Sequence, residues 1–450
     1  MRGRKLKNIF VSFFTIAAVL TSTFCGPAHE GTSRCFAAQE EGEEPETPSF
    51  EAAPKVILPE DEHITIRIAT WYDEYNLQHL KAYLANEFPN YDFEFVFIGK
   101  SNYEPIMDDQ LSFKGAPDIL YVDQEMTRKH AITGYFADLT DETEQFSSEA
   151  KVMFGYGNRV YAVPNTSQYT CIFYNKKIFE KYALNIPTDL DSFISTCDYI
   201  RLVKGMKPLS ISLKNMYDVS DLFLGVIAAS YLTTDRGSGF GGRLQYGRTT
   251  FTDEFGEYLD DWNKLISHNV LDKKMYTMDK QNAIEEFAGE ECAMICGGPD
   301  TYNAITRMNP DIEVGTMPFF GSRGKKRAII GGCDCGFAVN KNSLHLDQAK
   351  EVVGALGSYS GQTALWEDRP GSQTYLKDTA FINRENFDEL EEMIESGQAF
   401  TPWMQWGDDL NREPRRRLGI ELQKSLLGEQ SVKAALRIVD TVVAEILEQS

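Results

Sequence analysis

Aromatic and acidic side chains stand at points of the sequence where apolar, strand-like runs stop. Trp71 and Tyr72 follow one such run, and Asp123 follows residues 119–122. Aromatic rings offer apolar faces and a carboxylate accepts hydrogen bonds, so this group suits the binding of a small polar ligand. Other interpretations stay open: Trp71 packs in a core, or Asp123 and the nearby Glu125 only cap the next helix.

The sequence lacks the motifs that commonly accompany catalysis. Its six histidines are scattered without metal-ligand spacing, and neither a G-x-S-x-G elbow nor a phosphate-binding P-loop occurs. Residues 237–242 match G-x-G-x-x-G but follow a helical pattern, which favours a mobile glycine-rich loop over a dinucleotide site. With 67 Asp and Glu, counting alone leaves a glycosidase pair open. We expect no enzymatic activity and no cofactor.

Alternating apolar residues predict strands, and apolar residues at helical spacing predict the helices between them. Strands are expected over residues 64–68, 91–97 and 119–122, with a helix that ends at Phe88. This order predicts a parallel α/β sheet, and such sheets bind ligands at the carboxyl ends of their strands. Further strands are expected at 160–163, 171–174 and 292–296, and further helices at 190–202, 221–231, 255–267 and 431–447, the last capped by Ser431.

Length and charge limit the class of protein. A chain of 450 residues is long enough for two domains, and 42% hydrophobic residues can fill their cores. The formal charge of -22 repels nucleic acid and anionic lipid, so neither is an expected partner. The protein is expected to be a monomer.

Residues 1–38 are predicted to be a signal peptide. Basic residues precede an apolar run over residues 9–20, which is too short to span a bilayer. A secreted protein is therefore expected, beginning with an acidic flexible linker over residues 39–62. Lipidation of Cys25 is the alternative, although Phe24 stands where a lipoprotein signal has a small residue.

Beyond the predicted signal peptide, six cysteines alternate within apolar runs, which favours buried thiols over a disulfide. The C-x-C spacing of the last two is poor for zinc, and no metal is expected. The six are Cys171, Cys197, Cys292, Cys296, Cys333 and Cys335.

Short motifs recur in a characteristic order between residues 64 and 447. They lie at 158–164 with 172–176, at 187–193, at 287–290 with 293–294 and 298–299, at 314–318, at 331–332 with 337–339, and at 428–431. Their order and spacing resemble the carbohydrate-binding branch of the ABC-transporter solute-binding proteins, those similar to maltose-binding protein. Leu190 departs from the pattern, because the family often has Trp there.

The resemblance implies a type II periplasmic-binding-protein-like α/β fold with two lobes, a ligand cleft between them, and crossing hinge strands near Gln168 and Gly332. Lobe 1 would comprise residues 63–167, completed by about 337–385, and lobe 2 residues 168–336, completed by about 386–450. The resemblance also implies a non-catalytic extracellular receptor. Such a receptor captures a mono- or oligosaccharide by lobe closure and delivers it to the permease subunits of an ABC importer.

The positions that match the family's cleft combine aromatic, acidic and amide side chains, as the C–H faces and hydroxyls of a sugar require. Asp300 stands where the family often has a Trp that stacks on the sugar. Either Tyr302 would supply the stacking ring in its place, or the ligand would be more polar or cationic. A polyamine or other polar solute is thus the alternative ligand, and a secreted glycan-active enzyme the alternative function. A phosphate ligand is disfavoured because no Arg or Lys is apparent near the cleft. The expected ligand-binding residues are Trp71, Tyr72, Asp73, Asp123, Glu125, Gln168, Tyr169, Asp300, Tyr302, Trp366, Trp403 and Trp406.

Overall fold

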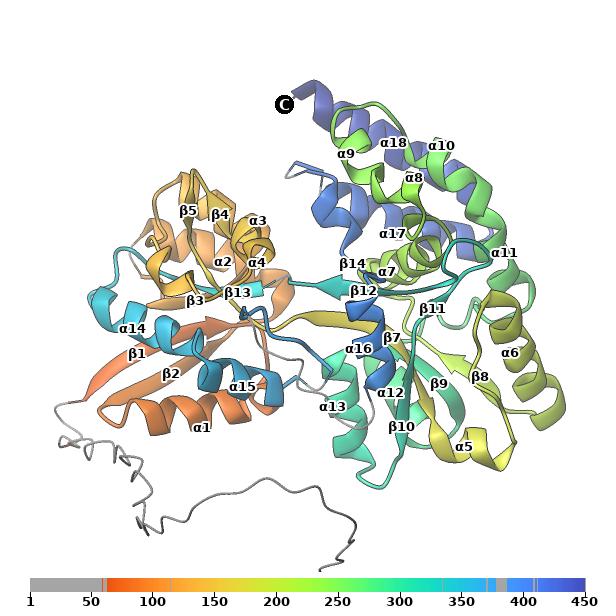
Figure 1. Cartoon of the computed structure of the whole chain (residues 1–450), viewed down its shortest axis with the longest axis horizontal. Helices are drawn as coiled ribbons and strands as arrows, with labels where there is room; N and C mark the ends of the chain where they lie inside the picture. Colours follow the sequence, from red (N-terminus) through yellow and green to blue (C-terminus); the bar gives the residue numbers. More distant parts are fainter. Residues whose placement is uncertain are drawn as a thin grey trace, which may run out of the picture. The chain divides into compact units, whose positions relative to one another are not determined.

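The structure is a computed structural model, and two larger β-sheets with helices around each of them form its framework (Figure 1). The predicted signal peptide, Cys25 and all of the predicted linker except Pro59 lie outside the described residues. Within the described part of the chain, no helix is both long and apolar enough to cross a membrane. The described residues are 59, 63–113, 115–333, 335–369, 371–377, 387–407, 409–410 and 412–449.

The first sheet has five strands in the order β2-β1-β3-β13-β6. Strand β1 pairs in parallel with β2 and β3, as the alternation of strands and helices along the chain predicts, whereas β13 runs antiparallel to β3 and β6. Ile66 and Ile68 of β1 are buried because every second side chain faces the core. The strands are β1 (Ile64–Thr70), β2 (Tyr91–Phe97), β3 (Ile119–Asp123), β6 (Val163–Pro164) and β13 (Cys335–Val339).

Helices cover this sheet, and together they form lobe 1. Leu80 and Leu84, one turn apart on α1, are almost fully buried against the sheet, as their spacing predicts. The helices are α1 (Gln78–Glu87), α2 (Lys100–Ser112), α3 (Gln124–Ile132), α4 (Ser148–Met153), α14 (Leu346–Leu356) and α15 (Tyr359–Glu367).

The second sheet has seven strands and a core of its own, and with its helices it forms lobe 2. The main order is β11-β12-β7-β9-β8, while β10 pairs with β7 and β14 with β12. Strand β8 is parallel to β9, but β7 is antiparallel to β9, β10 and β12. The strands are β7 (Gln168–Asn175), β8 (Lys207–Ser210), β9 (Cys292–Gly297), β10 (Val314–Met317), β11 (Phe319–Phe320), β12 (Arg327–Gly332) and β14 (Ala399–Phe400).

Lobe 2 draws helices from the middle and from the end of the chain. Fully buried Trp262 of α11 stands edge-on to Phe223 of α7, which gives this lobe a large aromatic core. Ser431 Oγ accepts a hydrogen bond from Ala434 N at 3.2 Å and caps α18, as predicted. The longer helices are α6 (Leu190–Lys204), α7 (Met216–Ile227), α11 (Leu259–Ser267), α12 (Lys280–Ala288), α13 (Pro299–Met308), α16 (Asp388–Glu395), α17 (Glu413–Leu427) and α18 (Val432–Gln449).

Two strand connections cross between the lobes side by side. The chain leaves β6 and enters β7 at Gln168, and it returns from β12 at Gly332 to β13 (Figure 1). Gly332 is the antiparallel partner of Gln168, so the crossing strands predicted at these two residues are confirmed. Gly331 has φ +132°, and a Cβ there would lie 1.8 Å from Gln168 O, so the close approach of the strands requires glycine.

The helix expected at 221–231 is confirmed, although it begins at Met216 and its last turn, Ala228–Leu232, is π-helical. Two local predictions were wrong. Residues 160–163 are divided between β5 (Arg159–Val160), which pairs with β4 (Gly155–Tyr156), and β6. The glycine-rich stretch 237–242 lies in two short helices, α8 (Asp235–Ser238) and α9 (Phe240–Gln245), in place of a loop. Close packing explains Gly237 and Gly241, because a Cβ there would lie 1.9 Å from Tyr231 O and 2.4 Å from Gln405 O, respectively.

Three of the predicted buried thiols are confirmed. Cys171, Cys197 and Cys292 are buried and carry free thiols. Burial raises the pKa of Cys292 to about 12, so this thiol stays protonated and behaves as a small hydrophobic side chain.

Candidate functional site

An aromatic cluster lies at the carboxyl ends of β1 and β3 in lobe 1. The Trp71 ring stands edge-on to Tyr121 at 4.6 Å and to Tyr103 at 5.0 Å, and Tyr72 stands edge-on to Tyr121 at 5.1 Å. Tyr72 N donates to Thr70 Oγ1 at 3.0 Å, which turns the chain at the strand end. Trp71 keeps an intermediate exposure, whereas Tyr72 is 8% and Tyr121 1% exposed. Trp71 and Tyr72 therefore lie together where the sequence predicts them.

A buried arginine supports this aromatic cluster. Arg369, which is 2% exposed, lies 4.2 Å from the centroid of the Tyr72 ring and donates from Nη1 to Tyr121 Oη at 2.9 Å. Burial acts to lower the pKa of Arg369, but Tyr121, Tyr72 and the Asp300 carboxylate outweigh it and raise the pKa. Gln168, at the crossing of the lobes, donates from Nε2 to Tyr72 Oη. The predicted residues Tyr72 and Gln168 are thus in direct contact.

Lys100 lies beside the aromatic cluster. Its Nζ lies 5.4 Å from the centroid of the Trp71 ring, and its positive charge acts, as a minor contribution, to lower the pKa values of Asp218 and Asp221 of α7. The expectation that no Arg or Lys lies near the cleft was therefore wrong. Lys100 follows the end of β2 closely, so the strand-end rule could have found it, whereas Arg369 follows α15 and carries no local signal.

The lobe 2 side offers a polar cavity of about 90 Å³ beside β8 and β9. Burial raises the pKa of Asp218 to about 6, with Lys280 lowering it and Asp221 raising it further. Burial also raises the pKa of Asp221, although Arg415 Nη2 binds both of its carboxylate oxygens at 2.7 and 2.8 Å. The sequence reasoning missed these acids, because the short strand β8 before them was not predicted. The polar lining residues are Thr170, Ser212, Asp218, Asp221, Lys280 and Thr301.

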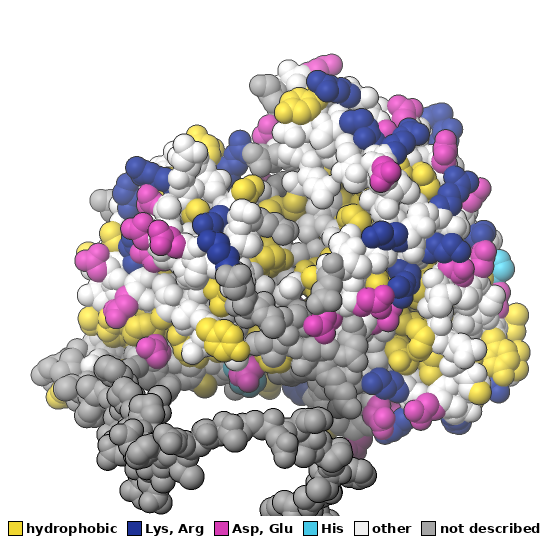
Figure 2. Space-filling view, in the orientation of Figure 1, with side chains coloured by type: hydrophobic (Ala, Val, Ile, Leu, Met, Phe, Trp, Pro, Cys, Tyr) yellow, Lys and Arg dark blue, Asp and Glu magenta, His cyan; other side chains and the backbone are white. Residues whose placement is uncertain are grey.

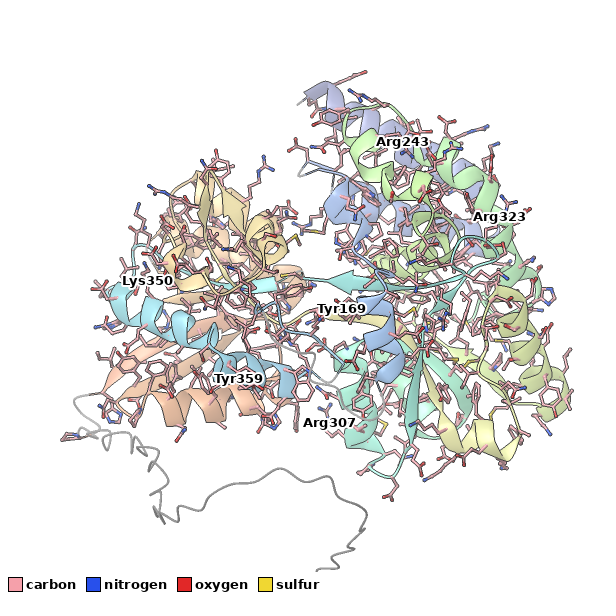
Figure 3. The ribbon with its side chains drawn as sticks, in the orientation of Figure 1. Tyr169, Arg243, Arg307, Arg323, Lys350 and Tyr359 are labelled. Carbon is pink, nitrogen blue, oxygen red and sulfur yellow. The ribbon has the colours of Figure 1, made fainter. Side chains whose placement is uncertain are left out.

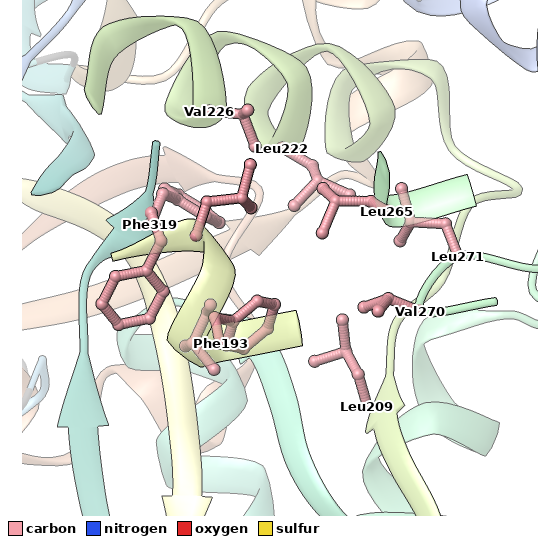
Figure 4. A pocket seen from close by; sticks show the side chains of 11 residues that line it. Phe193, Leu209, Leu222, Val226, Leu265, Val270, Leu271 and Phe319 are labelled. Atoms are coloured by element: carbon pink, nitrogen blue, oxygen red, sulfur yellow. The ribbon is translucent and has the colours of Figure 1, made fainter. Parts of the chain in front are cut away.

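A second cavity in lobe 2 is of a different kind. Its lining comprises Phe193, Leu209, Leu222, Val226, Phe319 and other hydrophobic side chains (Figure 4). It offers no polar group to a ligand, and we assign it to the packing of the hydrophobic core.

Helix α13 brings predicted residues to the crossing of the lobes. Asp300 lies in its first turn, and Asp300 Oδ1 is buried without a hydrogen-bond partner among the described residues. Tyr302 packs against Phe173 at 5.9 Å and Phe387 at 5.0 Å, so its ring belongs to a hydrophobic cluster of lobe 2. Tyr169, 5% exposed, lies near the start of β7, where the chain enters the second sheet from the crossing (Figure 3).

The three late tryptophans offer no open stacking face. Trp406 is fully buried in the core of lobe 2, edge-on to Phe251 at 4.9 Å, so its prediction as a cleft residue was wrong. Trp403 is 7% exposed, and the guanidinium of Arg415 covers its ring at 3.5 Å. Trp366 on α15 is 8% exposed. Pro402 and Gly407 predict a loop around Trp403 and Trp406, but both tryptophans are buried in the core of lobe 2.

The predicted acids of lobe 1 have structural partners. Asp73 is exposed and accepts hydrogen bonds from Tyr75 N at 3.1 Å and Asn76 Nδ2 at 2.9 Å. Asp123 accepts a hydrogen bond from Met126 N at 2.9 Å and caps α3, as the alternative interpretation proposed. These two carboxylates therefore stabilise the turn after β1 and the start of α3. No group of three or more His, Cys, Asp and Glu with metal-binding geometry is found within the described ranges.

Glu125 has a partner on the other lobe. Arg412, just before α17, contacts Glu125 Oε2 at 3.2 Å and Glu104 Oε2 of α2 at 2.5 Å. Burial raises the pKa of Glu125, while Arg412 lowers it. We call this group of Arg412, Glu104 and Glu125 the lobe bridge, because its arginine belongs to lobe 2 and its carboxylates to lobe 1.

A second set of contacts joins the lobes through α13. Asn303 Nδ2 donates to Asp368 O at 2.8 Å and to Asn76 Oδ1 at 3.3 Å, both in lobe 1. The guanidinium of Arg307 lies 4.3 Å from the centroid of the Tyr75 ring (Figure 3). Among the described residues, polar contacts thus connect the lobes at the lobe bridge, at α13 and at the contact of Gln168 with Tyr72.

Comparisons with known proteins agree with this architecture. A "Multiple sugar-binding protein" of Streptococcus mutans is 22% identical over 231 residues, 49% of this chain and 53% of that protein. The "Melibiose/raffinose/stachyose-binding protein MelE" of Bacillus subtilis is 24% identical over 289 residues, 61% of this chain and 63% of that protein. The chain thus spans between half and two thirds of the length of these curated relatives.

A solved structure and a family description extend the comparison. The crystal structure of a sugar transporter from Bacillus licheniformis in complex with stachyose superposes with a TM-score of 0.67 at 19% identity. The superposition covers 85% of this chain and 100% of that one, so the two-lobed fold is shared. Residues 87–378 match the sequence pattern of the family described as "Bacterial extracellular solute-binding protein". Because the match extends over more than half of its length, the chain belongs to the bacterial extracellular solute-binding protein family.

Proposed function

We propose that the protein is a receptor that binds a neutral oligosaccharide between its lobes and delivers it to an ABC importer. The observation that carries this proposal is the aromatic cluster of Trp71, Tyr72 and Tyr121, which is in contact with the buried guanidinium of Arg369. Aromatic faces pack against the C–H surfaces of a sugar, and flanking charged groups bind its hydroxyls. The curated relatives, both named as sugar-binding proteins, support the same ligand class.

The balance of charge favours a neutral ligand over the alternatives. A polyamine would meet Lys100 and Arg369, and a phosphate would meet Asp218 and Asp300. Either charged ligand would place like charges near each other in a partly buried site, which is unfavourable. A hydroxyl both donates and accepts hydrogen bonds, so it suits positive and negative neighbours alike.

We propose Trp71, Tyr72, Gln168 and Asp300 as ligand-binding residues among those predicted. Lys100, Asp218 and Arg369 are added because of their places beside the aromatic cluster and in the polar cavity. The lobes would comprise residues 63–167 with about 337–385, and 168–336 with about 386–450. The strand pairing of the two sheets and the crossing at Gln168 and Gly332 support this division.

Export and partners are part of the proposal. The mature protein would be secreted after removal of residues 1–38, would act as a monomer, and would dock on membrane permease subunits. Mass spectrometry of the native protein is expected to find an amino terminus between His29 and Gln39. A diacylglyceryl-modified Cys25 would contradict secretion and show a lipoprotein.

Thermal-shift measurements test the ligand class. Raffinose and stachyose are compared with spermidine and with amino acids, because a ligand that binds only the folded state stabilises it. Saturation at a hundredfold excess over the dissociation constant adds about 2.7 kcal/mol to the free energy of unfolding. A shift with spermidine and none with sugars would contradict the proposal. Prolonged incubation with oligosaccharide should yield no product, whereas a glycan-active enzyme would release one.

A further inference from the structure

The buried polar atoms that have no hydrogen-bond partner among the described residues include two on charged side chains near the crossing of the lobes, Asp300 Oδ1 and Arg369 Nε. Asp300 belongs to α13 of lobe 2, whereas Arg369 follows α15 of lobe 1. Leaving a buried charged group with an unmade hydrogen bond is costly, and such atoms are commonly satisfied by a ligand or by water.

The contacts around these atoms show that the two residues are neighbours. Asn303, one turn after Asp300 on the same face of α13, donates to the backbone oxygen of Asp368 at 2.8 Å. Asp368 directly precedes Arg369 in the chain. The charge of Asp300 acts on Arg369, although no ion pair joins the two side chains within the described ranges.

The aromatic cluster of the proposed site lies beside this pair. The guanidinium of Arg369 lies 4.2 Å from the centroid of the Tyr72 ring, and Gln168 donates to Tyr72 Oη. Gly298, at the start of α13, packs closely on Tyr169, since a Cβ on Gly298 would lie 2.8 Å from Tyr169 O. The pair therefore adjoins both the hinge and the residues proposed to bind ligand.

We propose that Asp300 and Arg369 form a clamp, one residue from each lobe, that binds a hydroxyl group of a neutral ligand. Arg369 Nε donates to the hydroxyl oxygen, and the same hydroxyl donates its hydrogen to Asp300 Oδ1. The clamp rests on the proposed function and adds to it a means of selecting ligands by charge. An ammonium group cannot accept from Arg369, and a carboxylate or phosphate dianion cannot donate to Asp300.

The variant Asp300→Asn tests the clamp, because it keeps the shape of the side chain and removes its charge. Titration calorimetry uses neutral trisaccharides (raffinose and maltotriose), an acidic one (trigalacturonic acid) and an amino one (the glucosamine trisaccharide). The native protein is expected to bind a neutral probe at least about tenfold more tightly than both charged probes. In Asp300→Asn, neutral binding is expected to weaken about 3- to 10-fold, the scale of one hydrogen bond. Preference over the acidic probe should also shrink at least about tenfold, because Arg369 is then left without its counter-charge.

Asp311→Asn is the matched control, since Asp311 is an exposed acid beyond the other end of α13. It should leave every affinity unchanged, and melting of both unliganded variants shows whether they are folded. If Asp300→Asn weakens neutral and acidic probes by the same factor, or changes neither, the clamp is wrong while the proposed function stands. If the native protein binds no neutral probe, or prefers a charged one, the proposed function is wrong and the clamp with it.

Discussion

Replacing Arg412 by Gln is expected to loosen the arrangement of the two lobes and to weaken ligand binding. The guanidinium belongs to lobe 2, and its partners Glu104 and Glu125 belong to lobe 1, at 2.5 and 3.2 Å. These contacts exist only while the lobes stand as they do in this structure. The variant removes them, so that Glu104 keeps Lys129 as a positive neighbour at 3.3 Å while Glu125 loses its pairing with Arg412.

The size of the effect follows from the exposure of the lobe bridge. The side chains of Arg412, Glu104 and Glu125 are 49%, 20% and 39% exposed, so water screens the pairs considerably. Partly exposed ion pairs contribute about 0.2–1 kcal/mol each, and two pairs that share one guanidinium should together contribute about 1 kcal/mol. That energy corresponds to about a fivefold change in the equilibrium between lobe arrangements, and to a similar loss of affinity.

Calorimetry with the identified ligand measures the affinity, and solution scattering measures the radius of gyration of the unliganded protein. Arg416→Gln is the matched control. Arg416 pairs with Glu413 of the same helix, α17, at 2.6 Å, and among the described residues it forms no ion pair with lobe 1. Arg412→Gln should bind more weakly and have a larger radius, and high salt should reduce both differences. If the two variants match in affinity and radius, the lobe bridge does not hold the lobes together.

Three further changes probe the cluster, the cavity and the hinge. Trp71→Ala should weaken ligand binding by about 1–3 kcal/mol in calorimetry, since the ring presents a partly exposed face, and unchanged affinity would remove Trp71 from the site. Asp218→Asn should raise stability to urea by about 1–3 kcal/mol at pH 7.5 and by almost nothing at pH 4. The variant gains stability because burial raises the pKa of Asp218 to about 6. The native carboxylate therefore destabilises the folded state increasingly as the pH rises from about 4 to 6, and asparagine avoids this cost. Gly331→Ala should cost more than about 2 kcal/mol in thermal unfolding, since its Cβ would clash with Gln168 O; an unchanged melting temperature would contradict the tight crossing.

Much of the fold could be predicted because its signals are local. The alternation of Ile64, Ile66 and Ile68 predicts β1, and the spacing of Leu80 and Leu84 predicts α1, since each period shows which side chains face a core. Short elements were less predictable. Strand β8 has four residues, too few for a period to show, and so the acids of α7 that follow it were missed.

The proposed site residues differ in how far their positions could be predicted. Trp71 and Tyr72 stand at a strand end that the apolar pattern indicates, and Gln168, which contacts Tyr72, stands at a crossing that the family resemblance implies. Trp406 was placed in the cleft from the Pro and Gly around it, but these residues describe only the local turn. Whether a turn faces solvent or a core depends on which residues pack over it. Here Phe251, far away in the sequence, packs against the Trp406 ring.

By itself, the sequence determined most of the longer strands and helices, because hydrophobic periodicity acts over a few residues. The two hinge crossings were implied by the family resemblance of the short motifs. Only the tertiary structure decided which charges meet at the cleft. Arg369 lies against Tyr72, and Lys100 acts on Asp218, across separations of more than a hundred residues. The strength of an electrostatic interaction depends on the distance between the charges in space and on their burial, and the spacing of residues along the chain predicts neither.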